Sequence, residues 1–229
     1  MSHRGALVFF VKTPGFSPIK TRLANEVGNA MAEEFYLRSL SVLRALAREI
    51  RGQRPRIDVW WAVAEDAALG SPHWLGLPTI GQGHGGLGNR LARVYGELLK
   101  VYDFVAMMGA DSPHIAVTKI IEALAVSERC GQESFVVGPC SDGGFYYFSG
   151  GRNIENTVWE SVGYSTENTL LDLCCALRDL APMVFLEPDF DVDTQSDLLR
   201  LARLRAREGE RELLAEQAEL VDWATRLLG

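Results

Sequence analysis

The sequence predicts an α/β fold with a mostly parallel central sheet. Two apolar runs without a polar face, residues 6–11 and 104–108, suit strands that are covered on both sides. Stretches with helical periodicity lie between such runs, which is the order that parallel strands need. Charged residues follow both runs, at the strand ends where α/β sheets bind their ligands.

The first element is the apolar strand over residues 6–11, and a long loop up to Arg22 follows it. Two prolines and a glycine in this loop prevent an immediate helix. Apolar residues then recur at helical spacing over residues 29–51, which predicts a long amphipathic helix. A parallel strand should come next, and residues 57–63 supply it. Residues 71–80 are interpreted as a turn and a brief strand.

The central strand covers residues 104–108 and stops at Asp111. Helical periodicity appears on both sides of it, over residues 87–102 and 115–126. This arrangement places the carboxylate of Asp111 at a strand end, above a cleft.

The second half begins with an antiparallel excursion. Residues 135–139 and 145–148 are interpreted as two strands joined by a turn. Ser165 is predicted to cap a helix that contains residues 170–177, and residues 182–186 form the last strand.

The carboxyl-terminal part is predicted to be helical. Thr194 is the expected cap of a helix through Arg207, and residues 210–229 suggest a helix packed on the body or against a partner. We expect one domain over residues 1–229. If a homodimer exists, this last helix with Trp223 is its expected contact.

Composition excludes several classes of partner. The formal charge of −7 and a pI near 5.2 argue against nucleic acid and acidic membranes as general partners. The four cysteines form no CxxC pair, which fits reduced thiols in a cytoplasm. The longest early apolar run, residues 6–11, is too short for a signal-peptide core or a membrane span. We therefore expect a cytoplasmic protein.

Lys12, Lys20 and Arg22 make the first loop cationic, although the chain has few lysines. Lysine offers a point charge and arginine a planar fork, so this loop suits a phosphate. A solvated basic loop is the alternative. A Walker A loop is rejected, because Pro14 and Ile19 stand where that motif needs glycine.

Asp111 and Asp193 are the candidate ligands for Mg²⁺ or Mn²⁺, because hard cations prefer carboxylate oxygens and both residues follow buried strands. Asp111 could instead be a helix cap. The neighbours Asp189, Asp191 and Asp197 compete with Asp193, and charge alone does not choose among them.

Asp142, Gly143 and Gly144 suit a substrate that lies against the backbone beside a carboxylate, although a plain hairpin turn is an equal alternative. Residues 81–86 match the Gly-x-Gly-x-x-Gly pattern of dinucleotide-binding proteins, but they follow a poor strand. His84 and His114 lack the spacing of a zinc site.

Four separated motifs carry a resemblance to a known family. They are Lys12-Thr13-Pro14-Gly15 with Lys20-Thr21-Arg22-Leu23, Gly109-Ala110-Asp111-Ser112-Pro113, Gly138-Pro139-Cys140-Ser141-Asp142-Gly143-Gly144-Phe145-Tyr146, and Asp191-Val192-Asp193-Thr194-Gln195-Ser196-Asp197-Leu198. The chain resembles the DUF2064 proteins of the GT-A superfamily over residues 6–200. Those proteins are described as glycosyltransferases or nucleotide-diphospho-sugar transferases and are similar to the guanylyltransferases of molybdenum-cofactor and coenzyme F420 biosynthesis.

The resemblance implies a three-layer α/β/α GT-A fold and assigns roles to residues. The nucleotide-binding residues it implies are Lys12, Thr13, Pro14, Gly15, Lys20, Arg22 and Arg90. It implies metal ligands at Asp111 and Asp193. This chain departs from the family pattern at Gly86, which replaces an acid, and at Tyr164, which replaces a tryptophan.

The leading hypothesis is a Mg²⁺-dependent transferase that uses a nucleoside triphosphate or a nucleoside-diphosphate sugar and a small-molecule acceptor. Lys20 and Asp142 are its predicted catalytic residues, and Asp142, Gly143 and Gly144 its substrate-binding residues. The alternatives are a nucleotidyltransferase, a nicotinamide-dependent oxidoreductase that uses residues 81–86, and an inactive nucleotide sensor or scaffold.

Overall fold

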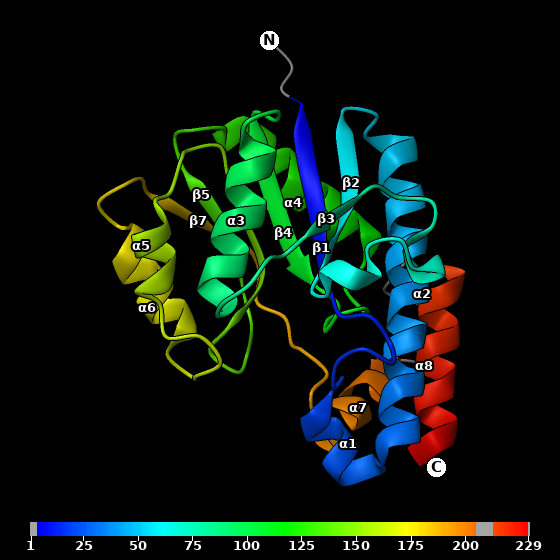
Figure 1. The fold of residues 1–229 in the computed structure, drawn as a ribbon. Helices are drawn as coiled ribbons and strands as arrows, with labels where there is room; N and C mark the ends of the chain where they lie inside the picture. Colours follow the sequence, from blue (N-terminus) through cyan, green and yellow to red (C-terminus); the bar gives the residue numbers. More distant parts are fainter. Residues whose placement is uncertain (1–3, 205–212, 229) are drawn as a thin grey trace.

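The computed structural model describes residues 4–204 and 213–228, and within them a seven-stranded sheet runs through the middle of the fold (Figure 1). In sheet order, the strands are β3 (Thr79–Gly81), β2 (Ile57–Val63), β1 (Gly5–Val11), β4 (Phe104–Gly109), β6 (Phe145–Gly150), β5 (Phe135–Pro139) and β7 (Met183–Phe185). The predicted central strand, β4, is therefore central in space as well.

Only β6 runs against its neighbours among these strands. It pairs antiparallel with β4 and β5, whereas every other pair in the sheet is parallel. The predicted sheet, mostly parallel with an antiparallel excursion, is confirmed. Because β6 is reversed, the turn that joins β5 to β6 lies at the same edge of the sheet as the end of β4.

Two layers of helices cover the sheet, because successive strand residues point to opposite faces. On β1, Leu7 and Phe9 belong to one apolar cluster and Ala6 and Val8 to the other. The first cluster also contains residues of α2 (Asn29–Gln53), α4 (Val117–Cys130), α7 (Gln195–Ala202) and α8 (Ala215–Leu228). The second contains residues of α3 (Leu87–Leu99), α5 (Asn156–Glu160) and α6 (Thr169–Leu177). The three-layer α/β/α architecture is confirmed.

Short helices complete the fold. Helix α1 (Thr21–Val27) follows the first loop and packs on α2, so the loop predicted to reach Arg22 ends at Lys20. Two 3₁₀ helices, η1 (Asp66–Ala68) and η2 (Pro72–Trp74), lie between β2 and β3. None of the helices in the described segments is long and apolar enough to cross a membrane.

One predicted helix cap is confirmed and one is wrong. Thr194 caps α7, and its hydroxyl accepts the backbone N–H of Asp197 at 3.3 Å. Ser165 does not cap α6, which begins at Thr169. The reason is the backbone of Ser165, whose φ of 62° places it in the left-handed region, in a tight turn before the helix. Arg207, the predicted end of the helix after Thr194, lies outside the described residues.

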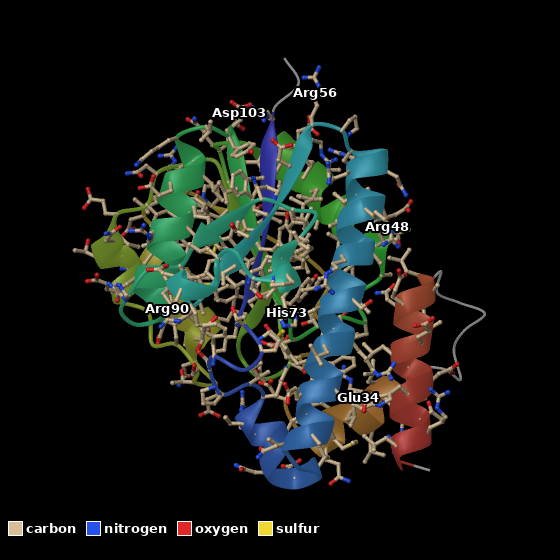
Figure 2. All side chains as sticks on the ribbon, turned by 45° about the vertical axis from the view of Figure 1, so that its right-hand side comes forward. Glu34, Arg48, Arg56, His73, Arg90 and Asp103 are labelled. Atoms are coloured by element: carbon tan, nitrogen blue, oxygen red, sulfur yellow. The ribbon has the colours of Figure 1, made fainter. Side chains whose placement is uncertain are left out.

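Helix α8 packs on the chain itself. The ring of Trp223 is 6.3 Å from that of Phe35 on α2, and Trp223 is only 7% exposed. Arg48 on α2 donates to Glu216 at 2.8 Å, and Figure 2 shows Arg48 on the part of α2 that runs beside α8. Trp223 is therefore part of the core, and the homodimer stays a prediction without that contact.

Candidate active site

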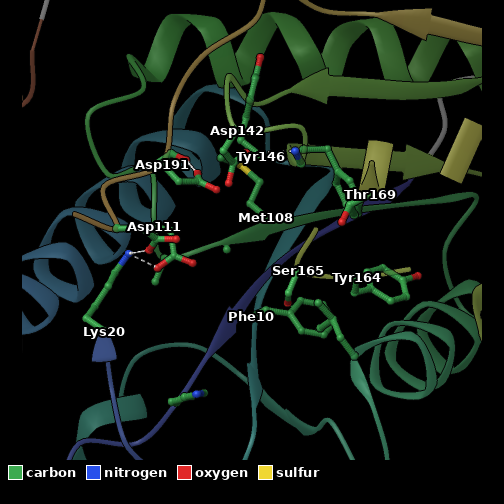
Figure 3. Close-up of a pocket in the computed structure, with 18 of the residues that line it drawn as sticks. Phe10, Lys20, Met108, Asp111, Asp142, Tyr146, Tyr164, Ser165, Thr169 and Asp191 are labelled. Atoms are coloured by element: carbon green, nitrogen blue, oxygen red, sulfur yellow. Dashed lines mark hydrogen bonds and ion pairs between the residues drawn. The ribbon is translucent and has the colours of Figure 1, made fainter. Parts of the chain in front are cut away.

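A cavity of about 660 Å³ opens at the carboxyl ends of β1 and β4. Its walls come from the first loop, the start of α3, the turn before β6 and the segment before α7 (Figure 3). The sequence-predicted residues that line it are Lys12, Lys20, Arg22, Arg90, Asp111, Asp142, Gly144 and Asp193. The structure does not bring Thr13, Pro14, Gly15 or Gly143 to this wall.

Lys20 joins the two predicted metal ligands. Its Nζ lies 2.5 Å from Asp111 Oδ1 and 2.8 Å from Asp193 Oδ1, and it donates to the carbonyl of Val192 at 2.7 Å. The Lys20 side chain is 3% exposed. Its backbone is left-handed, with φ 49° and ψ 45°, at the position that begins α1. Two aspartates from distant parts of the sequence therefore converge on one buried cation.

The charges of this group support one another. Burial by itself lowers the pKa of Lys20, but the negative charges of Asp111 and Asp193 outweigh it and hold that pKa above its usual value. Burial by itself raises the pKa of Asp193, but Lys20 and then Arg22 hold it below its usual value. Arg22 contributes through Nη2, which lies 2.5 Å from Asp193 Oδ2. Asp193 is therefore ionised at neutral pH.

Asp191 is a further acid in the cavity wall, and the sequence did not choose it over its neighbours. Its carboxylate accepts a hydrogen bond from the hydroxyl of Ser112. Burial, and then the negative charge of Asp111, raise the pKa of Asp191 to about 7. Figure 3 shows Asp191 between Asp111 and Asp142, with all three carboxylates at one end of the cavity.

The other acids of this segment have structural roles. Asp189 lies 2.9 Å from Nε2 of His114 and 3.0 Å from Nζ of Lys119. Asp197 accepts the backbone N–H of Thr194 at 2.9 Å and so completes the cap of α7. The structure thus separates four neighbouring aspartates that have equal charge in the sequence: Asp191 and Asp193 line the cavity, whereas Asp189 and Asp197 hold other parts of the chain.

The first loop is held in shape by two side chains from other elements. Glu65, just after β2, accepts the backbone N–H of Thr13 at 2.8 Å and the hydroxyl of Ser17. The hydroxyl of Tyr36 on α2 accepts the N–H of Lys12 and donates to its carbonyl, both at 2.8 Å. Sequence reasoning missed Glu65, although its place after a buried strand is the same signal that identified Asp111.

The middle of the first loop points away from the cavity. Thr13 is fully buried, and Gly15, whose φ is 82°, lines a separate hollow of about 500 Å³ with Phe16 and Asn25. The loop residues that line the cavity lie at its two ends and are Lys12, Ile19 and Lys20.

The turn before β6 positions Asp142. Its Oδ1 accepts the backbone N–H of Gly144 at 3.0 Å. Gly143 has a φ of 89°, and a Cβ there would lie 2.0 Å from the carbonyl of Glu167. Glycine is therefore required at position 143 for the turn to lie against the segment before α6, which forms the opposite wall.

The glycine-rich segment over residues 81–90 connects the sheet to one wall of the cavity, which Gln82, Leu87 and Arg90 line. The buried amide of Gln82 donates to the carbonyls of Val11 at 3.2 Å and Ala62 at 2.8 Å, which ties the ends of β1 and β2 together. Nε of Arg90 donates to the carbonyl of Gly85 at 3.1 Å, so this guanidinium is oriented by the loop before its helix.

The donor atoms at the acidic end suit a hard divalent cation. Asp111, Asp191 and Asp193 offer carboxylate oxygens, the ligands that Mg²⁺ and Mn²⁺ prefer. Cys140, Asp142 and Asp191 also bring one ligand atom each within 4.8 Å of one another. However, burial raises the pKa of the Cys140 thiol, so its sulfur stays protonated at neutral pH and is a poor ligand.

The sequence profile of the family described as "Uncharacterized protein conserved in bacteria (DUF2064)" matches residues 46–166, which is more than half of the chain. The chain belongs to the DUF2064 family. None of the curated proteins matches it.

Solved structures resemble the DUF2064 protein over nearly its whole length. One is a protein of Desulfovibrio desulfuricans G20 with a provisional description as a nucleotide-diphospho-sugar transferase; it is 22% identical, with 100% of this chain and 97% of that chain covered and a TM-score of 0.79. Glucosyl-3-phosphoglycerate synthase of Mycobacterium tuberculosis, in complex with Mn²⁺, UDP and phosphoglyceric acid, is 8% identical, with 92% and 80% covered and a TM-score of 0.51. CMP:2-keto-3-deoxy-manno-octonic acid synthetase in complex with CTP is 14% identical, with 90% and 99% covered and a TM-score of 0.52.

These likenesses confirm a GT-A-like fold for the DUF2064 protein. The relation to molybdenum-cofactor and F420 guanylyltransferases stays a prediction. The matched family segment contains Glu65, Arg90, Asp111 and Asp142 but ends before the segment of Asp191 and Asp193. The acidic end of the cavity is therefore assembled by the fold from residues inside and outside that segment.

Proposed function

We propose that this DUF2064 protein is a divalent-metal-dependent transferase that uses a nucleotide-activated donor, of the nucleotide-diphospho-sugar transferase class. The observation that carries this proposal is the meeting of Asp111, Asp193 and Lys20 in the wall of one large cavity. Solved structures of similar fold support it: one has a provisional description as a nucleotide-diphospho-sugar transferase, one is a synthase in complex with UDP and one is a synthetase in complex with CTP.

Asp111 and Asp193 would hold Mg²⁺ or Mn²⁺, with Asp191 as a further oxygen ligand. When bound, the metal neutralises the negative charge of a diphosphate leaving group. Raised pKa values at clustered carboxyls are common at functional sites, and Asp191 fits that pattern.

The basic side chains of the cavity would bind the phosphates of the donor. Lys12 lies at the start of the first loop, Arg22 lies on α1 just after the loop ends, and Arg90 lies on α3. At an effective dielectric constant of 20, a cation about 4 Å from a phosphate oxygen gains about 4 kcal/mol. Two such contacts are enough to orient a diphosphate, which agrees with the role expected for this loop.

The wall opposite Lys20 would bind the acceptor. Figure 3 shows Tyr164, Ser165 and Thr169 along this wall, with Asp142 at its upper end. Asp142 would take the proton of the acceptor hydroxyl as its oxygen attacks the anomeric carbon. The bond between that carbon and the diphosphate oxygen breaks, and the nucleoside diphosphate leaves with the bonding electrons.

Nucleotide binding with and without Mg²⁺ tests the proposal. We expect the parent to bind a nucleoside diphosphate at least tenfold more tightly with Mg²⁺, and Asp111→Asn to lose most of that gain. Asp179→Asn is the matched control, because the Asp179 side chain is 88% exposed and lies outside the cavity. An equal gain in the parent and in Asp111→Asn would remove the central assignment.

The products separate the proposed reaction from its main alternative. A nucleotidyltransferase releases diphosphate from a nucleoside triphosphate, and the similarity of fold to a synthetase in complex with CTP favours testing it. A glycosyltransferase releases a nucleoside diphosphate from a nucleotide sugar. An inactive nucleotide sensor would bind the donor without releasing either product. Mass spectrometry of nucleotide carried through purification would identify the base.

A further inference from the structure

The Lys20 ammonium group lies between Asp111 and Asp193, in the position that the proposed metal would occupy. Its ammonium group has three N–H donors, and its three oxygen partners are Asp111 Oδ1, Asp193 Oδ1 and the carbonyl of Val192. A metal ion in contact with both Oδ1 atoms would lie about 2.0–2.1 Å from each of them. The ammonium group lies 2.5 and 2.8 Å from the same two atoms, so the two cations cannot hold this pair at once.

The remaining contacts of these acids leave little room for another arrangement. Asp193 Oδ2 already lies 2.5 Å from Nη2 of Arg22, so both oxygens of Asp193 face cations of the first loop segment. Asp111 is more open, with a side chain that is 46% exposed. A metal can therefore approach Asp111 from the cavity, but it reaches Asp193 only when Lys20 withdraws.

Withdrawal of Lys20 alone is unfavourable, because its ammonium group is nearly fully buried and would lose its anionic partners. A phosphate group in the cavity supplies replacement partners for it. Metal and phosphate would then stabilise each other. The metal would replace Lys20 as the partner of the carboxylates, and the phosphate would replace the carboxylates as the partners of Lys20. By linkage, each raises the affinity of the site for the other by the same factor.

We propose that Lys20 is an internal counter-cation of the Asp111–Asp193 pair, and that it gives up the pair to a divalent metal only when the phosphates of the donor replace those carboxylates as its partners. This inference rests on the proposed function. It adds that the metal and the donor bind as a coupled pair, and that Lys20 is the source of the coupling.

Binding of Mn²⁺ alone to the full chain, followed by the electron paramagnetic resonance signal of free Mn²⁺, tests this role. We expect Lys20→Met to bind Mn²⁺ at least tenfold more tightly than the parent. Lys100→Met is the matched control, because the Lys100 side chain is 68% exposed and pairs with Glu97 outside the cavity. Its Mn²⁺ affinity should equal that of the parent. Unchanged or weaker Mn²⁺ binding in Lys20→Met would overturn the inference.

If Lys20→Met does not fold, a measurement on the parent tests whether Lys20 changes partners when metal and phosphate bind. The chain has four lysines, at positions 12, 20, 100 and 119, so lysine labelled with ¹³C at Cε gives few NMR signals to assign. Mg²⁺ with inorganic pyrophosphate should move the Lys20 signal, and Mg²⁺ alone should move it much less. A Lys20 signal that stays in place while Mg²⁺ and pyrophosphate bind would overturn the inference and leave the proposed function standing. If neither the parent nor the variants bind Mn²⁺ or pyrophosphate, both the inference and the proposed function are overturned.

Discussion

Oε2 of Glu65 lies 2.8 Å from the backbone nitrogen of Thr13, so a carboxylate at the end of β2 fixes the loop that follows β1. The same carboxylate also accepts the hydroxyl of Ser17. This loop carries Lys12 at one end and Lys20 at the other, and both lysines line the cavity. Glu65 therefore controls the position of the proposed phosphate-binding groups without being a member of the cavity wall.

We expect Glu65→Ala to weaken binding of the Mg²⁺–nucleotide complex about tenfold, which equals about 1.4 kcal/mol. The reason is that the loop must then be ordered at the moment of binding. Isothermal titration calorimetry measures the effect. Glu49→Ala, which removes a partly exposed acid of α2 outside the cavity, should leave the affinity within twofold of the parent. Equal affinities of Glu65→Ala and Glu49→Ala would mean that the loop holds its shape unaided.

The stability of the metal-free protein should depend on Asp191. Its pKa in the folded protein is about 7, against an ordinary value of 3.8, because burial and the charge of Asp111 disfavour the ionised form. The folded state therefore binds more protons than the unfolded state between these values, so the free energy of unfolding falls as pH rises through this range. We expect metal-free Asp191→Asn to be more stable than the parent at pH 8, by about 1 kcal/mol or more.

Urea unfolding at pH 8 and pH 5 measures this difference, which should shrink at the lower pH. A second check uses the carboxyl ¹³C signal of Asp191. In Asp111→Asn its pKa should be lower than in the parent, because one of the two causes of the shift is gone. A stability difference that does not change with pH would contradict the assignment of a raised pKa to Asp191.

Gln217 of α8 should be important for stability, because its buried amide holds the loop after Asp111. Its Nε2 donates to the carbonyls of Pro113 at 2.9 Å and Ile115 at 2.8 Å. Gln217→Ala leaves these carbonyls without their donor, which should lower the free energy of unfolding by about 2–3 kcal/mol. Gln53→Ala, at an exposed glutamine of α2, should change it by less than about 0.5 kcal/mol. Similar losses for both variants in chemical denaturation would disprove this role.

The hydroxyl of Tyr164 should contribute nothing to stability. It is buried and has no hydrogen-bond partner among the described residues, and burial raises its pKa. Tyr164→Phe should therefore leave the melting temperature unchanged or raise it. Tyr147→Phe provides the contrast, because the hydroxyl of Tyr147 lies 2.7 Å from that of Ser127 and is fully buried. Its loss should cost about 1 kcal/mol. A clear drop in melting temperature for Tyr164→Phe would reveal a partner for that hydroxyl.

The sequence predicted those parts of the fold whose causes lie close together in the chain. Strand β4 is an apolar run of adjacent residues, and the helices beside it show their periodicity within a few turns. The cap at Thr194 is likewise local, because Asp197 lies in the next turn. The prediction for Ser165 was wrong because its left-handed backbone belongs to a turn that packs against the tip of the β5–β6 hairpin, which is distant in the sequence.

The candidate site was predicted in part, because the fold rule that ligands bind beyond strand ends selects Asp111 and the loop after β1. The sequence could not show that Asp191 and Asp193 have different roles. Both residues face the cavity, and they differ only in their contacts. The supporting roles of Glu65 and Gln217 depend on contacts between segments that are far apart in the chain. Periodicity and short motifs carry no signal for such contacts.

The reversed direction of β6 has a consequence for how this protein family can diversify. The turn from Cys140 to Gly144 joins two strands that already lie side by side, so its length is not set by the need to cross the sheet. Insertions at this tip would reshape the end of the cavity where we propose that the acceptor binds, and would leave the paired strands in register. Relatives that share Lys20, Asp111 and Asp193 but differ in this hairpin are therefore the natural place to look for changed acceptor preference.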